Sequence, residues 1–127
     1  MSRNNIIVLN RGDSYDFDVT INDESSIDGR YHLRESDVLY LGIMDPGQPF
    51  EEALIKKRLT ANETDPSGNI TLALVPEDTL ELLPGKYFYS VKLHLSHTEY
   101  DLKTNEPIGY VDRVVTVINK TKFILCE

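Results

Sequence analysis

The chain has 127 residues, of which 40% are hydrophobic and 27% are charged. This length suits one domain with its own core, and the balance is typical of a folded globular protein. Its 21 acidic and 13 basic residues give a formal net charge of −8, which argues against nucleic acid and anionic membranes as partners because both are negatively charged.

The cysteine content and the first apolar run indicate the compartment in which the protein folds. The lone cysteine, Cys126, excludes an internal disulfide and a zinc site built from cysteines. The run at residues 6–9 ends at Asn10 and Arg11, and it is too short for the core of a signal peptide or for a membrane span. We therefore expect assembly inside a cell, in a reducing compartment.

Alternation of apolar and polar residues is the dominant pattern, and it is typical of strands with one buried face. It occurs in residues 14–21, 70–74 and, most clearly, 87–96. Residues 38–44 and 111–118 are apolar on both faces, which indicates central strands that are packed from both sides.

Three further apolar runs, at residues 6–9, 53–59 and 122–125, bring the total to about seven or eight short strands. Proline and glycine place turns between them, at residues 45–49, 65–69, 83–85 and, as a hairpin between the last two long strands, 105–109. Residues 76–82 are expected to form one helical turn, because acidic residues suit a helix N-terminus. Residues 1–127 are thus predicted to form a single all-β domain, a β-sandwich.

The same alternation predicts which side chains are buried. We expect the core to contain the apolar members of the strongest strands: Phe17, Val19, Leu41, Leu72, Tyr89, Val91 and Val115. Asp16 and Asp18 then share a solvated outer face.

No set of residues predicts catalysis or metal binding. His94 and His97 would point to opposite faces of one strand, and we expect both, with His32, to face solvent. The triplet Arg11-Gly12-Asp13 separates an apolar run from the first alternating strand, so Gly12 is expected to serve a turn or bulge. We expect a protein that is not an enzyme, with no catalytic residue, no cofactor and no metal site.

A turn at Leu83-Pro84-Gly85 leads directly into the strand that begins near Tyr87. Immunoglobulin-like sandwiches often begin a late strand in this way, with the tyrosine hydroxyl bonded back to the turn. The alternative is an ordinary turn before an aromatic-rich strand, and both interpretations are compatible with a sandwich.

Four phrases, in this order, carry a resemblance to a known family: residues 11–19, which open a strand; residues 33–43, a polar turn before an apolar strand; and the two turn-and-strand phrases at 65–72 and 83–91. In pattern and order they resemble the N-terminal immunoglobulin-like domain of upper baseplate proteins from phages of low-GC bacteria, over residues 6–118. The resemblance implies an immunoglobulin-like β-sandwich. Upper baseplate proteins continue into a helical or fibrous region, whereas this sequence ends at Glu127, so we expect an accessory subunit.

The resemblance leads us to expect a structural component of a bacteriophage or phage-tail-like particle, such as a contractile bacteriocin, in the baseplate or tail. Its partners would be other virion or tail subunits in a symmetric oligomer, and its location the virion, assembled in the bacterial cytoplasm. A capsid decoration protein is one alternative. A carbohydrate-binding module is another, because seven tyrosines are available to stack on sugars, although tryptophan is absent.

The two termini are the predicted contact segments, because they lie outside the strongest strand pattern. The candidate partner-binding residues are Ile6, Ile7, Val8, Phe123, Ile124 and Leu125. The run at residues 121–126 either docks on a neighbouring subunit as a strand or completes the sheet of its own chain.

Overall fold

The computed structural model of the chain describes residues 6–23, 29–34, 36–63 and 70–127. These residues form strands β1 (Ile7–Asn10), β2 (Tyr15–Val19), β3 (Val38–Met44), β4 (Ile55–Thr60), β5 (Ile70–Leu74), β6 (Gly85–Tyr100) and β7 (Pro107–Cys126). One helical turn, α1 (Pro76–Thr79), and two short 3₁₀ helices, η1 (Phe50–Glu52) and η2 (Ala61–Glu63), lie between strands. The predicted all-β class and the predicted helical turn are confirmed. The turn predicted at residues 65–69 lies outside the described residues.

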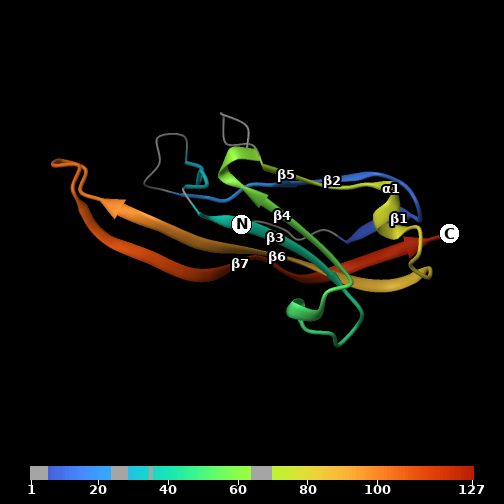
Figure 1. Cartoon of the computed structure of the whole chain (residues 1–127). Coiled ribbons are helices and arrows are strands. Elements are labelled where there is room, and N and C mark those ends of the chain that lie inside the picture. The colour runs from blue at the N-terminus through green and yellow to red at the C-terminus, as the bar shows by residue number, and fades with distance from the viewer. Residues whose placement is uncertain (1–5, 24–28, 35, 64–69) are drawn as a thin grey trace.

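The strands form two sheets (Figure 1). The larger sheet has the order β1-β7-β6-β3-β4, and the smaller one pairs β2 with β5. All neighbours are antiparallel except β1 and β7, which run parallel from Ile7↔Phe123 to Asn10↔Cys126. The segments near the two ends of the chain therefore lie side by side in one sheet.

The core lies between the inner faces of the two sheets. Phe17 on β2 reaches across to Tyr89 on β6, with 5.4 Å between the ring centroids. Six of the seven predicted core residues are buried, and Val115 is the exception because it is only half-buried. Val115 lines a groove (described below) that the small sheet does not fill.

The last strand differs from the prediction in two respects. The runs at 111–118 and 122–125 belong to one strand of 20 residues, because a register shift between Tyr89 and Val91 absorbs the polar interruption at Asn119 and Lys120 without ending the pairing. The run at 111–118 is also not central. Among the described residues, β1 reaches only residues 123–126, so no strand covers the outer edge of β7 before that point.

Two local contacts show how turns hold the sheets. Gly12 has φ 86°, and its N–H donates a 2.9 Å hydrogen bond to the buried Thr79 hydroxyl of α1, so the Arg-Gly-Asp triplet is a turn, as predicted. The Tyr87 hydroxyl donates a 2.5 Å hydrogen bond to the Leu83 carbonyl. The interpretation of residues 83–87 as a tyrosine bonded back to its turn is therefore confirmed.

Candidate functional site

The end of the β6–β7 hairpin projects beyond the rest of the large sheet (Figure 1). β3 pairs with β6 only between Phe88 and His94, whereas β6 continues to pair with β7 from Leu95↔Arg113 to Tyr100↔Pro107. We call residues 95–113 the hairpin arm. Within the arm, β6 and β7 pair with each other, and no other strand of the described residues pairs with either of them.

The tip of the arm is ordered by one side chain. Asp101 Oδ1 accepts hydrogen bonds from the backbone N–H groups of Lys103, at 2.7 Å, and Thr104, at 3.2 Å. Asn105 closes the loop with φ 59° and donates its N–H to the Asp101 carbonyl at 2.8 Å, and asparagine tolerates this left-handed conformation better than most residues. Leu102 is fully exposed on this tip. The arm therefore presents an apolar side chain on a loop with a defined shape.

Other apolar side chains of the arm are also exposed. Ile108 and Tyr110 have 65% and 63% of their surface exposed, and Tyr100 has 49%. Single exposed apolar residues are normal on soluble proteins, but several gathered on one element mark an interaction surface.

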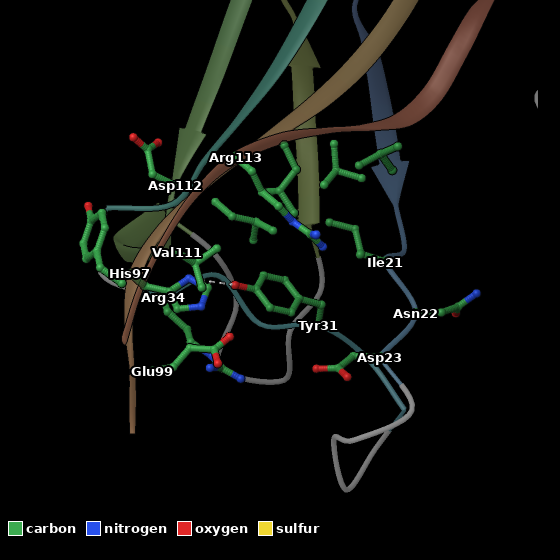
Figure 2. Close-up of a pocket in the computed structure, with 15 residues that line it drawn as sticks. Ile21, Asn22, Asp23, Tyr31, Arg34, His97, Glu99, Val111, Asp112 and Arg113 are labelled. Carbon is green, nitrogen blue, oxygen red and sulfur yellow. Dashed lines mark hydrogen bonds between the residues drawn. The ribbon is translucent and has the colours of Figure 1, made fainter. Parts of the chain in front are cut away.

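A groove of about 720 Å³ lies between the inner face of the arm and residues 21–23, Tyr31 and Arg34 (Figure 2). Most of its apolar lining comes from β6 and β7: Leu93, Leu95, Val111, Val115 and Val117. Charged and aromatic side chains surround that lining, and in the close-up Tyr31 and Arg113 both project into the space. An apolar lining with a few placed polar groups is typical of a binding groove.

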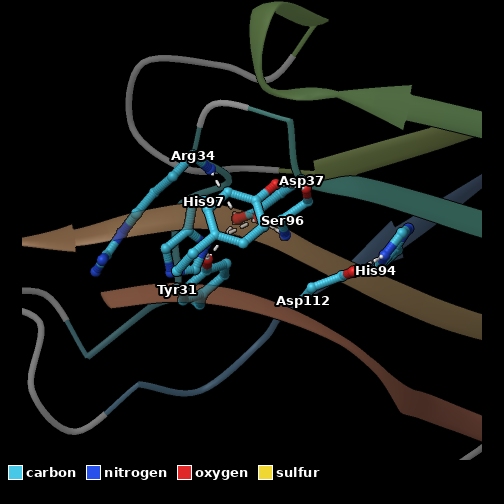
Figure 3. Close-up of polar contacts among 8 residues, drawn as sticks. Tyr31, Arg34, Asp37, His94, Ser96, His97 and Asp112 are labelled. Carbon is cyan, nitrogen blue, oxygen red and sulfur yellow. Dashed lines mark hydrogen bonds and ion pairs between the residues drawn. The ribbon is translucent and has the colours of Figure 1, made fainter. Parts of the chain in front are cut away.

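A buried polar cluster ties residues 31–34 and 36–37 to the arm (Figure 3). The Asp37 carboxylate is fully buried and accepts hydrogen bonds from the Tyr31 hydroxyl at 2.5 Å, the Arg34 N–H at 2.9 Å and the Ser96 N–H at 2.6 Å. His97 Nδ1 lies 2.9 Å from the same carboxylate. Four partners satisfy this carboxylate, as a buried charge requires.

The cluster shifts the acidity of two of its members. Burial by itself would raise the pKa of Asp37, but the hydrogen bonds from Tyr31, His97, Ser96 and Arg34 outweigh it, and the pKa is lowered. Burial, followed by the hydrogen bond to Asp37, raises the pKa of the Tyr31 hydroxyl. Tyr31 therefore keeps its proton, and its ring is held in place along the groove.

The histidines are partly as predicted. His94 and His97 do lie on opposite faces, because His94 is paired with Asp112 at 2.7 Å on an exposed face and His97 points inward. The prediction that His97 faces solvent is wrong, since only 3% of it is exposed. The reason is that Tyr31 and Asp37, from a part of the chain that shows no strand pattern, contact His97 on the inner face of β6.

Alternation divides the six predicted contact residues into two sets. Ile7, Phe123 and Leu125 point inward and belong to the core, so a partner does not reach their side chains. Ile6 and Val8 are exposed, at 57% and 62%, and Ile124 is half-buried. Of the two alternatives for residues 121–126, the structure has the second: the segment completes its own sheet, between β1 and β6.

Sequence reasoning predicted a hairpin between the last two long strands, but it missed that the hairpin projects beyond the sheet, and it missed the groove and the cluster around Asp37. Residues 111–118 are apolar on both faces, but that pattern is the same for a central strand and for a strand at a free edge. Nothing in residues 29–37 signals that Tyr31 and Asp37 meet His97.

Within residues 6–23, 29–34, 36–63 and 70–127, no group of three or more His, Cys, Asp or Glu side chains is arranged to hold a metal ion. No helix in these ranges has the length and apolar character needed to cross a membrane. In comparisons with protein-family models, with curated proteins and with solved structures, no match to the chain is found. Its function has to be inferred from its own residues.

Proposed function

We propose that this protein is a structural subunit of a bacteriophage or phage-tail-like particle, in the baseplate or as a tail accessory, and that it acts by docking on neighbouring subunits. The single observation that carries the docking role is the hairpin arm with its exposed apolar side chains. The placement in a phage-type particle comes from the resemblance of residues 6–118 to the N-terminal domain of upper baseplate proteins.

The strand order supports the immunoglobulin-like part of this proposal. In immunoglobulin-like sandwiches, strands C, F and G share one sheet, to which variable-type domains add C′, while B and E lie in the other. Here β3, β6 and β7 occupy the places of C, F and G, β4 that of C′, and β2 and β5 those of B and E. The hydrogen bond from Tyr87 to Leu83 lies at the start of the strand in the F position, where such domains carry their tyrosine corner.

The arm has the properties of a docking element. Apolar side chains that are held at the interface before binding lose little conformational freedom, so more of the contact energy appears as affinity. The backbone that carries Leu102 is already ordered by the hydrogen bonds within the tip, and Ile108 lies on the paired strand β7, so little backbone freedom is lost on docking. The exposed side chains of Ile6 and Val8 provide a second apolar surface for docking, near the chain ends.

The proposal is tested by replacing the apolar side chains of the arm in the producing bacterium. A strain that lacks the gene is complemented with the wild-type chain, with a Leu102→Ser/Ile108→Ser variant, or with Leu83→Ser as a control. Leu83 is 77% exposed but lies before β6, away from the arm. Particles are purified and probed by immunoblotting and electron microscopy.

We expect the wild-type and Leu83→Ser chains in the particles and the arm variant in the soluble fraction. Labelling of the purified particle then distinguishes baseplate or tail from the capsid decoration alternative. If the wild-type chain is absent from purified particles, the proposed function is wrong; if the arm variant is incorporated normally, the arm is not the docking element.

A carbohydrate-binding module is the second candidate, and the groove is the observation that favours it. Tyr31 and Tyr110 line the groove beside the charged Arg34, Glu99 and Arg113, and aromatic faces with polar neighbours suit sugar rings. Calorimetric titration with fragments of bacterial cell-wall polysaccharide tests it. Binding that Tyr110→Ala weakens would favour the sugar-binding function.

A further inference from the structure

The outer edge of β7 is the longest stretch of the large sheet without a strand neighbour. From Pro107 to Lys122, β7 pairs with β6 on one side, and no strand among the described residues pairs with its other side. The strand is rich in β-branched residues along this stretch and includes Val114, which is 61% exposed. A long apolar edge of this kind is a template for pairing with another strand.

The opposite edge of the same sheet is protected. β4 carries three consecutive basic residues, Lys56, Lys57 and Arg58, and charged edge residues discourage strand addition. Residues 107–118 carry one acidic and one basic residue in a chain whose net charge is −8. Two copies can therefore approach along β7 without the charge repulsion that most of their surface produces.

The charges on β7 exclude two of the ways in which two copies could pair along this edge. In a two-fold antiparallel pair, each residue faces a residue of the other copy, and the two residue numbers have a constant sum. An axis at Asp112 sets two carboxylates opposite each other, and an axis at Arg113 does the same with two guanidinium groups, and directly opposed like charges destabilise a strand pair. An axis at Val114 avoids both.

With the axis at Val114, no two like charges of residues 107–121 lie opposite each other. Val114 faces Val114 of the second copy, Val111 faces Val117, and Arg113 faces Val115. Asp112 faces Thr116, and the chain already contains this kind of cross-strand pair. On the small sheet, Thr71 lies opposite Asp18 and donates a 3.0 Å hydrogen bond to its carboxylate.

We propose that two copies of this chain pair along the outer edges of their β7 strands, antiparallel, about a two-fold axis at Val114. The pairing joins two five-stranded sheets into one continuous sheet and brings Val111 and Val117 of each copy together beside the two grooves. Because the interface is isologous, one pairing covers this stretch of edge on both copies and closes the assembly at a dimer.

This inference deepens the proposed assembly role by naming one partner, a second copy, and it concerns the edge of β7 instead of the tip of the arm. It is tested on the isolated protein, so its outcome is separate from that of the particle experiment. If the protein dimerises in solution but is absent from particles, this inference stands and the proposed function is wrong.

The first measurement is sedimentation equilibrium over a series of protein concentrations. A strip of edge pairing is a small interface, so we expect a reversible monomer–dimer equilibrium that shifts with concentration. Val114→Lys places two ammonium groups on the axis and should weaken dimerisation at least tenfold. The matched control is Val8→Lys, which changes the net charge by the same amount at a residue of almost equal exposure on β1, and it should dimerise as the wild type does. Thermal melting of both variants verifies that each is folded.

The second measurement locates the axis by disulfide trapping. Opposed Cβ atoms in an antiparallel pair lie about 4.5–5.5 Å apart, close to the separation that a disulfide needs. In a Cys126→Ser background, oxidised Val114→Cys should give a covalent dimer, and Val8→Cys should stay monomeric. The proposal is overturned if the wild type is monomeric at all concentrations. It is also overturned if Val8→Lys weakens the dimer and Val114→Lys does not, or if only Val8→Cys gives a covalent dimer.

Discussion

Asp37 and His97 lie 2.9 Å apart between the carboxylate Oδ1 and the imidazole Nδ1, and both side chains are buried. Sixty positions separate them in the sequence. The contact fastens the segment that precedes β3 to the base of the hairpin arm on β6. The Asp37 carboxylate therefore holds the side of the groove that contains Tyr31 against the side formed by β6 and β7.

Replacing Asp37 with asparagine tests the importance of this contact. Asp37→Asn keeps the size of the side chain, but it removes the charge that strengthens its hydrogen bonds with Tyr31 and His97. We expect the free energy of unfolding to fall by about 2–3 kcal/mol, as is usual for buried hydrogen bonds to a charged group. Denaturant unfolding measures the loss. The control is Asp112→Asn, whose exposed carboxylate is paired with His94 and should cost less than about 1 kcal/mol; equal losses for the two variants would contradict this role.

The stability difference between the wild type and Asp37→Asn should depend on pH. The pKa of Asp37 is lowered in the folded protein, so the ionised carboxylate stabilises the fold at pH values above its unfolded pKa, which is about 3.9. That contribution is lost as the pH falls through the lower, folded-state pKa. The stability difference between the wild type and Asp37→Asn should therefore be constant near neutral pH and shrink in acid, below about pH 4. Melting curves of the two proteins across this pH range check this expectation. A stability difference that grows in acid would contradict it.

Tyr87→Phe should lower the free energy of unfolding by about 1 kcal/mol, because the Leu83 carbonyl loses the hydrogen bond from the Tyr87 hydroxyl. The matched control is Tyr110→Phe, whose hydroxyl contacts Ser96 on an exposed part of the arm, and its effect should stay within about 0.5 kcal/mol. Urea unfolding of both variants gives the comparison. If the two losses are equal, the turn before β6 does not depend on this tyrosine.

Gly42 provides a steric test of the outer face of the large sheet. A Cβ at this position would lie 2.7 Å from Phe50 Cε2 and 3.2 Å from the Ala53 Cβ, so Gly42→Ala should destabilise the fold by about 1–3 kcal/mol through overpacking. Gly109→Ala is the control, because nothing lies within 4 Å of its Cβ position. Adding Phe50→Leu to Gly42→Ala should recover part of the loss in thermal melting. A neutral Gly42→Ala would mean that η1 moves aside freely.

Neighbouring residues near the C-terminus should respond differently to the same change. Phe123 is fully buried between β1 and β6, so Phe123→Ala should cost about 3–5 kcal/mol. Ile124 points to the other face and is half-buried, and Ile124→Ala should cost clearly less. Differential scanning calorimetry of the two variants tests whether residues 121–126 are an intrinsic part of the sheet. Equal costs would show that they are not.

Several parts of the fold could be predicted from the sequence because their cause is local. A strand with one buried face has side chains that alternate with a period of two, so β2 and β6 and most of their buried residues follow from the order of apolar residues. The turns at Gly12 and before Tyr87 follow from the backbone preferences of glycine and proline. The helical turn at Pro76 follows from the acidic residues that suit a helix N-terminus.

Other features were decided only by the tertiary structure, because they depend on which segments meet. A run that is apolar on both faces does not reveal whether it has one strand neighbour or two, so residues 111–118 were assigned to the centre of a sheet when they form an edge. The sequence does not divide the apolar residues of the two terminal segments into an inward and an outward set, because only the pairing of β1 with β7 decides which of them face the core. The burial of Asp37 and His97 has no sequence signal, because a charged side chain is placed in a core by the hydrogen-bond partners that distant segments bring to it.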